Sequence, residues 1–194
     1  MSDVAMQCKE TSVSLSLLAE YAKVPIRFEV HSLFEIEGDN PASAVLIERK
    51  VDQPWIKDYD AIEGEGPIRW AKRWDVSNWG MLIASTGDQP VGGTVLAHNT
   101  DGVNKLEGRD DLVAMWDIRV QPDARGQGIG HILFEAAVEW ARERHCSEIK
   151  IETQNINVPA CRFYQRQGCS LSSINREAYE ELPEEIELIW SLAI

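Results

Sequence analysis

Three glycines stand at alternate positions in the stretch 125–130, a spacing suited to binding a phosphate group. The stretch reads Arg125, Gly126, Gln127, Gly128, Ile129, Gly130. Glycine lacks a Cβ atom, so a ligand can approach the backbone amides of this turn closely. A predicted helix begins directly after the turn, and the unpaired N–H groups at a helix N-terminus favour an anion. The sequence therefore predicts a pyrophosphate site, the alternative being an ordinary glycine-rich turn between a strand and a helix.

The turn differs from two common phosphate-binding motifs. A P-loop requires Gly-Lys-Ser/Thr after a first glycine and four residues, but Gly130 is followed by His131 and Ile132. A dinucleotide fingerprint G-x-G-x-x-G that began at Gly126 would have its third glycine at position 131, and Gly130 stands one residue early. A different pyrophosphate-containing ligand is therefore expected.

Two carboxylates and one phenol could move protons. Asp117 lies among apolar residues in a predicted strand, where a carboxylate is costly unless it is paired or functional, and Arg119 would face it in a regular strand. Glu152 lies near the end of the next predicted strand, where it could also be solvated or ion-paired. The phenol of Tyr164, with an ordinary pKa of about 10, can donate a proton at neutral pH. Either carboxylate could serve as a general base, and together they could bind a cation.

Hydrophobic periodicity places these residues on a strand, helix and strand. Leu112–Val120 is predicted as a strand, and Glu148–Thr153, with alternating β-branched residues, as another. Between them an amphipathic helix starts at the glycine turn. The unit should have a right-handed crossover. The apolar helix positions are Ile129, Ile132, Leu133, Ala136, Ala137, Trp140 and Ala141.

The rest of the chain gives weaker signals. We expect a short helical or irregular lead over 1–24, a turn at Gly38–Pro41 and a polar loop over 99–111. Predicted regular elements are a strand over Ile26–Ile36, a short helix over Trp70–Trp74, a hairpin formed by Trp79–Ser85 and Pro90–Ala97, and a last strand over Glu185–Leu192.

The segment Pro54–Pro67 combines acidic and aromatic residues and is predicted as a loop. Trp55, Asp58 and Tyr59 could hold an amine through carboxylates and cation–π contacts. The alternative is a solvated loop whose aromatic side chains anchor it to the core.

A second motif makes a family resemblance specific. Arg125, Gly128 and Gly130 fit the coenzyme A turn Arg/Gln-x-x-Gly-x-Gly/Ala of the GNAT superfamily of N-acetyltransferases. The later segment resembles the superfamily's Asn-x-x-Ala-x-x-x-Tyr-x-x-x-Gly-Phe at Asn157, Ala160, Tyr164 and Gly168, with Cys169 in place of the final Phe. The run Glu-Thr-Gln-x-x-Asn-Val-Pro-Ala-Cys over 152–161 is similar to the streptothricin acetyltransferases. The resemblance is firm over about 111–171.

The resemblance implies a fold, a cofactor and roles for residues. The expected fold is a mixed α/β GNAT fold over 1–194, whose central, mostly antiparallel sheet has a parallel pair splayed at the acetyl-coenzyme A site and is flanked by helices. The expected reaction is direct acetyl transfer from acetyl-coenzyme A to an amine in a ternary complex, with Tyr164 protonating the departing thiolate. Expected cofactor-binding positions are the backbone of Ile118, Arg119 and Val120, the turn Arg125, Gly126, Gln127, Gly128, Ile129, Gly130 and His131, and Asn157, Ala160 and Tyr164. Expected acceptor-binding residues are Trp55, Asp58, Tyr59, Trp116, Asp117 and Glu152.

Composition limits the partners. The chain of 194 residues carries a formal net charge of −13, which argues against nucleic acid and agrees with a cationic acceptor. No run of 18 apolar residues predicts a membrane span, and residues 1–10 do not resemble a secretory signal. The four cysteines lack metal-ligand spacing and are expected to be reduced thiols of a cytoplasmic protein that holds no metal.

Three functional hypotheses follow. The first is an acetyltransferase of a small amine, of streptothricin type and so an antibiotic-resistance activity. The second is an acetyltransferase of a protein or a polyamine. The third is a module that binds acyl-coenzyme A without turnover, against which Tyr164 and Asn157 argue. A homodimer, common in the superfamily, is a further possibility.

Overall fold

The computed structural model describes residues 6–194, and the chain folds into two compact units. The first unit contains residues up to Ile26, Tyr59–Ile149 and Ile194, and the second contains Arg27–Asp58 and Lys150–Ala193. The prediction of one domain over 1–194 stays a prediction.

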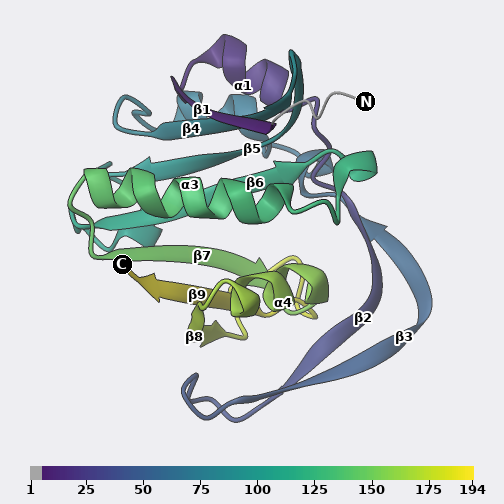
Figure 1. Ribbon diagram of the computed structural model, residues 1–194. Helices are drawn as coiled ribbons and strands as arrows, with labels where there is room; N and C mark the ends of the chain where they lie inside the picture. The colour runs from purple at the N-terminus through teal and green to yellow at the C-terminus, as the bar shows by residue number, and fades with distance from the viewer. Residues whose placement is uncertain (1–5) are drawn as a thin grey trace. The chain divides into compact units, whose positions relative to one another are not determined.

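The first unit is built on four antiparallel strands. β1 pairs with β4, β4 with β5, and β5 with β6. Helix α3 runs along β4, β5 and β6, as Figure 1 shows. The elements are β1 (Met6–Ser12), α1 (Leu15–Tyr21), η1 (Tyr59–Ala61), α2 (Pro67–Arg73), β4 (Gly80–Thr86), β5 (Gln89–His98), η2 (Asn104–Leu106), β6 (Leu112–Val120), η3 (Pro122–Ala124) and α3 (Ile129–Glu143).

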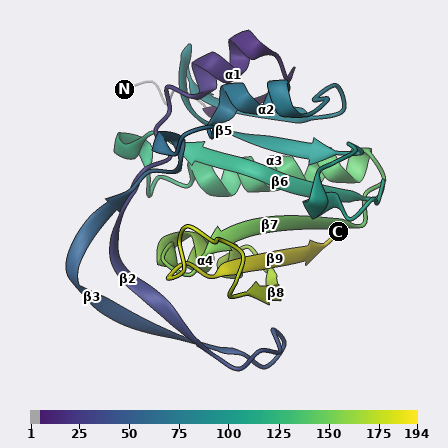
Figure 2. The same ribbon diagram turned by 180° about the vertical axis from the view of Figure 1, so that it is seen from behind.

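Helices cover both faces of these strands. On one face α3 comes so close to β4 that a Cβ on Gly80 would lie 2.4 Å from the Trp140 ring. The opposite face carries α1 and α2 (Figure 2). There Leu18 and Trp70 join a buried cluster with Val95 and Ala114. Burial of this apolar surface is the main force that holds the unit together.

A β-bulge in β6 changes which side chains face α1 and α2. Val95 pairs with Asp117, whereas the next residue, Leu96, pairs with Met115. Trp116 is therefore the extra residue, and the alternation of faces shifts by one position there. As a result Asp117 and Arg119 project to the same face as Ala114.

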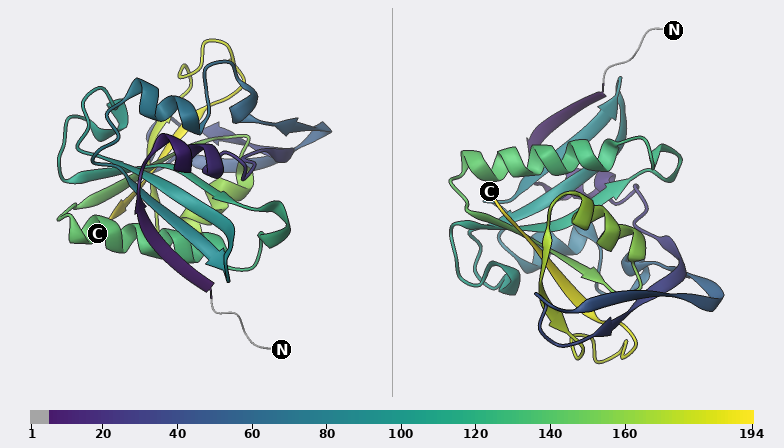
Figure 3. Two further views of the ribbon diagram at one scale, coloured as in Figure 1. Left: turned by 90° about the horizontal axis from the view of Figure 1, so that it is seen from above. Right: turned by 60° about the horizontal axis from the view of Figure 1, so that its bottom comes forward.

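The second unit combines a long hairpin with a helix and shorter strands. β2 and β3 pair antiparallel, as do β8 and β9. Val30, Phe34 and Ile36 of the hairpin are buried, as are Cys161 and Tyr164 of α4. Figure 3 shows the β2–β3 hairpin beside α4, β8 and β9. The elements of the unit are β2 (Phe28–Glu37), β3 (Val45–Lys57), β7 (Glu148–Gln154, which begins in the first unit), α4 (Val158–Arg166), β8 (Ser170–Asn175) and β9 (Glu187–Ala193).

The predicted fold class is confirmed. The structure is a mixed α/β fold with a mostly antiparallel seven-stranded sheet of order β1-β4-β5-β6-β7-β9-β8, in which β6 and β7 are the parallel pair. The predicted strands at 112–120 and 148–153, the helix after the glycine turn and the hairpin around Gly87-Asp88 are all present.

Three local predictions are incomplete. The lead over 1–24 contains β1 from Met6 as well as α1, and residues 1–5 lie outside the described part of the chain. The segment Pro54–Pro67 is not all loop, because Trp55 belongs to β3, which the sequence analysis missed, and η1 follows. The loop over 99–111 contains η2, where Val103 and Leu106 are buried.

Candidate active site

The glycine turn leaves backbone amides accessible at the start of α3. Gly126 and Gly128 have φ angles of +77° and +83°, which L side chains rarely adopt. A Cβ on either glycine would meet no atom within 4 Å, so the space above the turn is open. Gly128 is the N-cap of α3 and offers no side-chain hydrogen bond to the first helical turn. The N–H groups that such a cap would occupy are therefore placed to receive an anion.

Side chains beside the turn hold its backbone. Arg125 donates from Nε to the Val120 carbonyl at 3.1 Å and from Nη2 to the Pro25 carbonyl at 3.2 Å. Burial lowers the pKa of Arg125. Gln127 donates to the Asp123 carbonyl at 3.1 Å, while His131 is exposed on α3. Arg125 thus connects the end of β6 to the turn.

The pairing of β6 with β5 determines which backbone N–H groups among Ile118, Arg119 and Val120 point away from β5. Gln121 donates its N–H to Val91 of β5. Successive residues of a strand point their N–H groups to opposite edges. The N–H of Arg119, two residues before Gln121, therefore also points to β5. The N–H groups of Ile118 and Val120 point the other way. These two, rather than Arg119, are the candidates for a donor to a ligand.

Asp117 lies in a buried network of charges. Arg119 donates from Nε to Asp117 Oδ1 at 2.8 Å and from Nη2 to Oδ2 at 2.9 Å. The same guanidinium binds both carboxylate oxygens of Asp60, at 2.5 and 3.0 Å. Tyr21 donates its hydroxyl to Asp117 Oδ1 at 2.5 Å. Both oxygens of Asp117 therefore have charge-assisted hydrogen bonds.

The guanidinium holds this network together. Its side chain is 1% exposed, and Asp60 and Asp117 are 26% and 4% exposed. Burial works against the charge of Arg119, but Asp117 and Asp60 outweigh it and raise the pKa of Arg119 above its ordinary value. The ion pair between Asp117 and Arg119 that the sequence analysis considered is thus present, with Tyr21 and Asp60 as additional partners.

Two acceptor candidates of the first unit lie in different surroundings. Trp116, at the bulge, contacts the Trp74 ring edge-on with centroids 4.8 Å apart and lies 5.4 Å from the Trp79 ring. It packs against the buried cluster of this unit. Tyr59 begins η1, one residue before Asp60.

In the second unit, Asn157 caps helix α4. Its Oδ1 accepts from the Ala160 N–H at 3.2 Å, which satisfies one of the unpaired amides of the first turn. The carbonyl end of the Asn157 amide is therefore used within the protein, and its Nδ2 is the end suited to a ligand carbonyl. Two of the predicted cofactor-binding residues, Asn157 and Ala160, thus contact each other at the start of α4.

Tyr164 lies on the buried face of α4, with Val158 and Cys161. It is 4% exposed, and its ring meets the Phe163 ring edge-on at 5.1 Å between centroids. Burial raises the pKa of the neighbouring Cys161 thiol to about 11. Cys161 therefore acts as a small apolar residue in this helix.

Glu152 forms a hydrogen-bonded triangle with Gln154 and Tyr179. Tyr179 donates its hydroxyl to Glu152 Oε1 at 2.5 Å. Gln154 donates from Nε2 to the Tyr179 hydroxyl at 2.8 Å and to Glu152 Oε1 at 3.3 Å. Burial and the Glu152 carboxylate raise the pKa of Tyr179 above its ordinary value. The carboxylate is half-buried, unlike that of Asp117.

The remaining acceptor candidates lie at the end of β3. Trp55 is 38% exposed and pairs with Val30 of β2. Asp58 follows Lys57, whose ammonium forms a buried ion pair with Glu185. This pair connects the end of β3 to the segment before β9.

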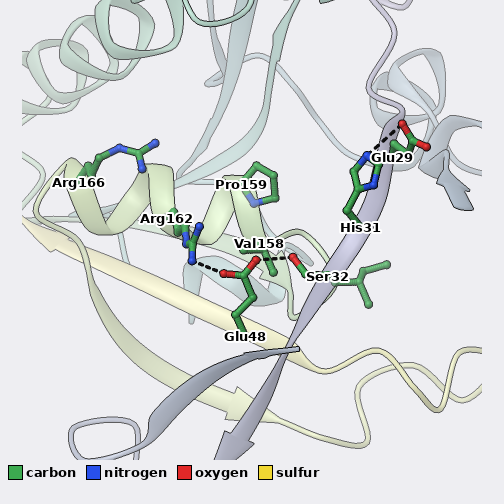
Figure 4. Close-up of a pocket in the computed structure, with 9 residues that line it drawn as sticks. Glu29, His31, Ser32, Glu48, Val158, Pro159, Arg162 and Arg166 are labelled. Atoms are coloured by element: carbon green, nitrogen blue, oxygen red, sulfur yellow. Dashed lines mark hydrogen bonds and ion pairs between the residues drawn. The ribbon is translucent and has the colours of Figure 1, made fainter. Parts of the chain in front are cut away.

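A groove of about 320 Å³ lies between α4 and the β2–β3 hairpin (Figure 4). Four of its charged side chains, Glu29, His31, Glu48 and Arg162, lie in pairs. Glu48 accepts from Ser32 at 2.5 Å and pairs with Arg162, and His31 lies 3.1 Å from Glu29. These mutual contacts point to no class of ligand.

Four residues of these networks had no predicted role, namely Tyr21, Asp60, Tyr179 and Gln154. Tyr179 alone had a local signal, because it is the one aromatic residue in the acidic segment 176–187. Within residues 6–194 no group of His, Cys, Asp or Glu could hold a metal ion. In the same range, no helix is long and apolar enough to cross a membrane.

Comparison with known proteins gives one family. Residues 46–169 match the model of the Acetyltransferase (GNAT) family, which is more than half of the chain.

Two curated relatives share a sequence segment with the chain. Streptothricin acetyltransferase A of Bacillus subtilis (strain 168) is 37% identical over 96 residues, covering 45% of this chain and 56% of the relative. A streptothricin acetyltransferase of Escherichia coli is 39% identical over 75 residues, covering 39% of this chain and 43% of the relative. The chain thus spans about half the length of the curated relatives it matches.

Several solved structures share the fold over nearly the whole chain, and one of them contains a bound ligand. It is a proposed streptothricin acetyltransferase from Bacillus anthracis str. Ames in complex with acetyl coenzyme A. The TM-score is 0.74 at 22% identity, covering 98% of this chain and 100% of the other.

Proposed function

Because the chain belongs to the acetyltransferase (GNAT) family, we propose that it transfers the acetyl group of acetyl-coenzyme A to a primary amine of a small cationic molecule. The proposed acceptor class is that of streptothricin, and the amine attacks directly within a ternary complex. The observation that carries the proposal is the glycine turn at the start of α3.

The turn fits the pyrophosphate of acetyl-coenzyme A. Gly126 and Gly128 present backbone in a conformation that side-chain-bearing residues rarely adopt, beneath open space that a Cβ would enter. The uncapped N–H groups of α3 and its dipole stabilise negative charge. Asn157 would bind the pantetheine arm through Nδ2, beside Ala160. When bound, acetyl-coenzyme A supplies the acetyl group as a reactive thioester.

The acceptor amine must lose a proton before it can attack. An alkyl ammonium with a pKa near 10 leaves only about one molecule in a thousand neutral at pH 7. We assign proton removal to Glu152, directly or through water, because its carboxylate is half-buried and accepts hydrogen bonds from the neutral donors Tyr179 and Gln154. Asp117 is held by Arg119 and Tyr21, so we assign it to the structure of the first unit.

Two further groups complete the proposed chemistry. The N–H groups of Ile118 or Val120 stabilise negative charge on the acetyl oxygen. Tyr164 holds its phenolic proton at neutral pH and gives it to the leaving sulfur. Trp55, Asp58, Tyr59 and Trp116 stay predicted acceptor-binding residues.

Charge and relatives support the acceptor class. The net charge of −13 suits a cationic molecule, and the two curated relatives are named for streptothricin acetylation. On this proposal the biological role is antibiotic resistance. The four cysteines are free thiols, and the proposed location is the reducing cytoplasm.

The test is coenzyme A release by the purified protein with streptothricin, with spermidine and with a peptide bearing an N-terminal amine. We expect rapid release with streptothricin and an acceptor mass increased by one acetyl group. Faster release with spermidine or the peptide would replace streptothricin by that class. Binding of acetyl-coenzyme A with no release for any amine would make the protein a non-catalytic binding module.

A matched pair of variants tests the turn itself. Gly128→Ala and Gly108→Ala both place a Cβ at positive φ in open space, so both carry a similar backbone strain. Only Gly128→Ala should weaken the binding of acetyl-coenzyme A, as measured by calorimetry. Equal affinities in the two variants would contradict the pyrophosphate assignment.

A further inference from the structure

We propose that Tyr179 is a positioning residue, which fixes the orientation of the Glu152 carboxylate toward the cationic acceptor. The proposal rests on the proposed function, in which Glu152 takes the proton of the acceptor. It assigns a role to a segment outside the motifs of the sequence analysis.

The hydrogen bonds around Glu152 fix one oxygen of the carboxylate. Oε1 accepts from Tyr179 at 2.5 Å and from Gln154 at 3.3 Å. Gln154 also donates to the Tyr179 hydroxyl at 2.8 Å, so the three side chains form a closed triangle. With Oε1 held by two donors, rotation of the carboxylate is restricted, and the direction of Oε2 follows. A base held in one orientation needs less reorganisation when the amine arrives.

The segment that carries Tyr179 is anchored on both sides. Arg176 donates from Nη2 to the carbonyls of Ile36 and Gly38 at 2.9 and 3.2 Å. On the other side Asn155 accepts from the Ile186 N–H at 2.9 Å, and Glu185 forms its buried ion pair with Lys57. These contacts hold the segment in place without any help from the Tyr179 hydroxyl. The hydrogen bond from Tyr179 to Glu152 is therefore not needed to anchor the segment, and its effect is on the orientation of the carboxylate.

Tyr179 remains a proton donor at working pH. Burial and the negative charge of Glu152 both raise its pKa above the ordinary value, which is about 10. The hydroxyl therefore stays neutral at pH 7–9 and does not compete with Glu152 as a base. On this proposal Tyr179 affects the reaction only by orienting the Glu152 carboxylate.

A double-mutant cycle separates positioning from a structural role. Wild type, Tyr179→Phe, Glu152→Gln and the double variant are compared for kcat and KM with the acceptor and for the KM of acetyl-coenzyme A. We expect Tyr179→Phe to lower kcat/KM for the acceptor about tenfold, with the KM of acetyl-coenzyme A unchanged. In the Glu152→Gln background the same change should have no further effect, because the group it orients is gone.

A control removes the same kind of contact elsewhere. Tyr21→Phe also deletes a hydroxyl 2.5 Å from a carboxylate, and thermal unfolding of every variant reports stability. Tyr21→Phe should lower the unfolding midpoint and change kcat/KM much less than Tyr179→Phe.

The outcomes distinguish this inference from the proposed function. The inference is overturned if Tyr179→Phe keeps wild-type kcat/KM while Glu152→Gln loses it, or if Tyr179→Phe has the same effect in both backgrounds. Wild-type turnover by Glu152→Gln would instead overturn the assignment of the base. No turnover by the wild type with any acceptor would overturn the proposed function itself, and this inference with it.

Discussion

Each compact unit contains a tyrosine hydroxyl 2.5 Å from a carboxylate oxygen, and the two pairs differ in their surroundings. In the first unit Tyr21 donates to Asp117, whose two oxygens also bind Arg119. In the second unit Tyr179 donates to Glu152, which also accepts from the neutral amide of Gln154. Asp117 is 4% exposed, whereas Glu152 is half-buried.

The difference shows that a contact alone does not define a role. A buried carboxylate fully bonded to a guanidinium loses charge-assisted hydrogen bonds when it is replaced. The half-buried carboxylate that accepts hydrogen bonds from Tyr179 and Gln154 is the one to which the proposed function gives the role of base. We therefore expect changes at Asp117 to act on stability and changes at Glu152 to act on turnover.

The largest expected effect is on the turnover of Glu152→Gln. Loss of a general base lowers kcat/KM by about 10²- to 10⁴-fold, while the urea midpoint should change little. The measurement is steady-state kinetics with the acceptor beside urea unfolding. Glu184→Gln removes the same charge from an exposed position in the same unit and should leave both quantities unchanged. If both variants lose activity equally, charge alone attracts the acceptor and the distinction between the two carboxylates fails.

Next in size is the stability loss of Asp117→Asn. The amide would place a donor against the Arg119 guanidinium, and breaking a buried ion pair costs about 3 kcal/mol. Urea unfolding measures this loss, with Asp88→Asn in the exposed β4–β5 turn as the matched change. The folded variant should keep kcat within a few-fold of wild type. A stable but inactive Asp117→Asn would reverse the roles assigned to Asp117 and Glu152.

A smaller effect separates the two tyrosines themselves. Tyr21 is 3% exposed, and deletion of its hydroxyl should cost about 1–2 kcal/mol of stability, because water cannot replace the buried hydrogen bond. Tyr179 is half-buried, and its Phe variant should lose less than about 1 kcal/mol. Paired urea titrations give the difference. The opposite order would mean that Tyr179 holds the second unit together.

The smallest expected effect is on stability at alkaline pH. The folded pKa of Tyr179 is raised, so its contribution to stability is fully present below the unfolded pKa of about 10. That contribution is lost as the pH rises from there toward the folded pKa, because only the unfolded chain releases the proton. Stability measured from pH 8 to 11 should therefore fall less steeply in Tyr179→Phe. Parallel curves would show that the hydroxyl titrates alike in both states.

Local patterns predicted the elements that carry the cofactor motifs. Alternation in Leu112–Val120 and the apolar stripe after Gly128 each reflect one buried face, so the periodicity of the sequence is enough to find them. β3 was missed because most of its residues are exposed, and its sequence contains a proline and charges at positions that face solvent. Exposed strands lack the alternation on which such a prediction depends.

The networks around the carboxylates depend on long-range contacts. The position of Asp117 beside Arg119 was predictable from strand geometry. Tyr21 and Asp60 join them from 96 and 59 residues away, and no local pattern encodes such a meeting. The bulge at Trp116 was likewise invisible, because it is a property of the pairing with β5. Tyr179 had a local signal in its acidic surroundings and Glu152 was a predicted base, but no local pattern linked the two.

The division of the second unit between two chain segments has a consequence for synthesis. Residues Arg27–Asp58 leave the ribosome before the whole of Tyr59–Ile149, and their partners in Lys150–Ala193 come last. At ordinary rates of translation this delay is on the order of 10 s. During it the apolar side chains of Val30, Phe34 and Ile36, buried in the finished protein, have no partner from the later segment. The nascent hairpin therefore exposes apolar surface until the later segment is synthesised.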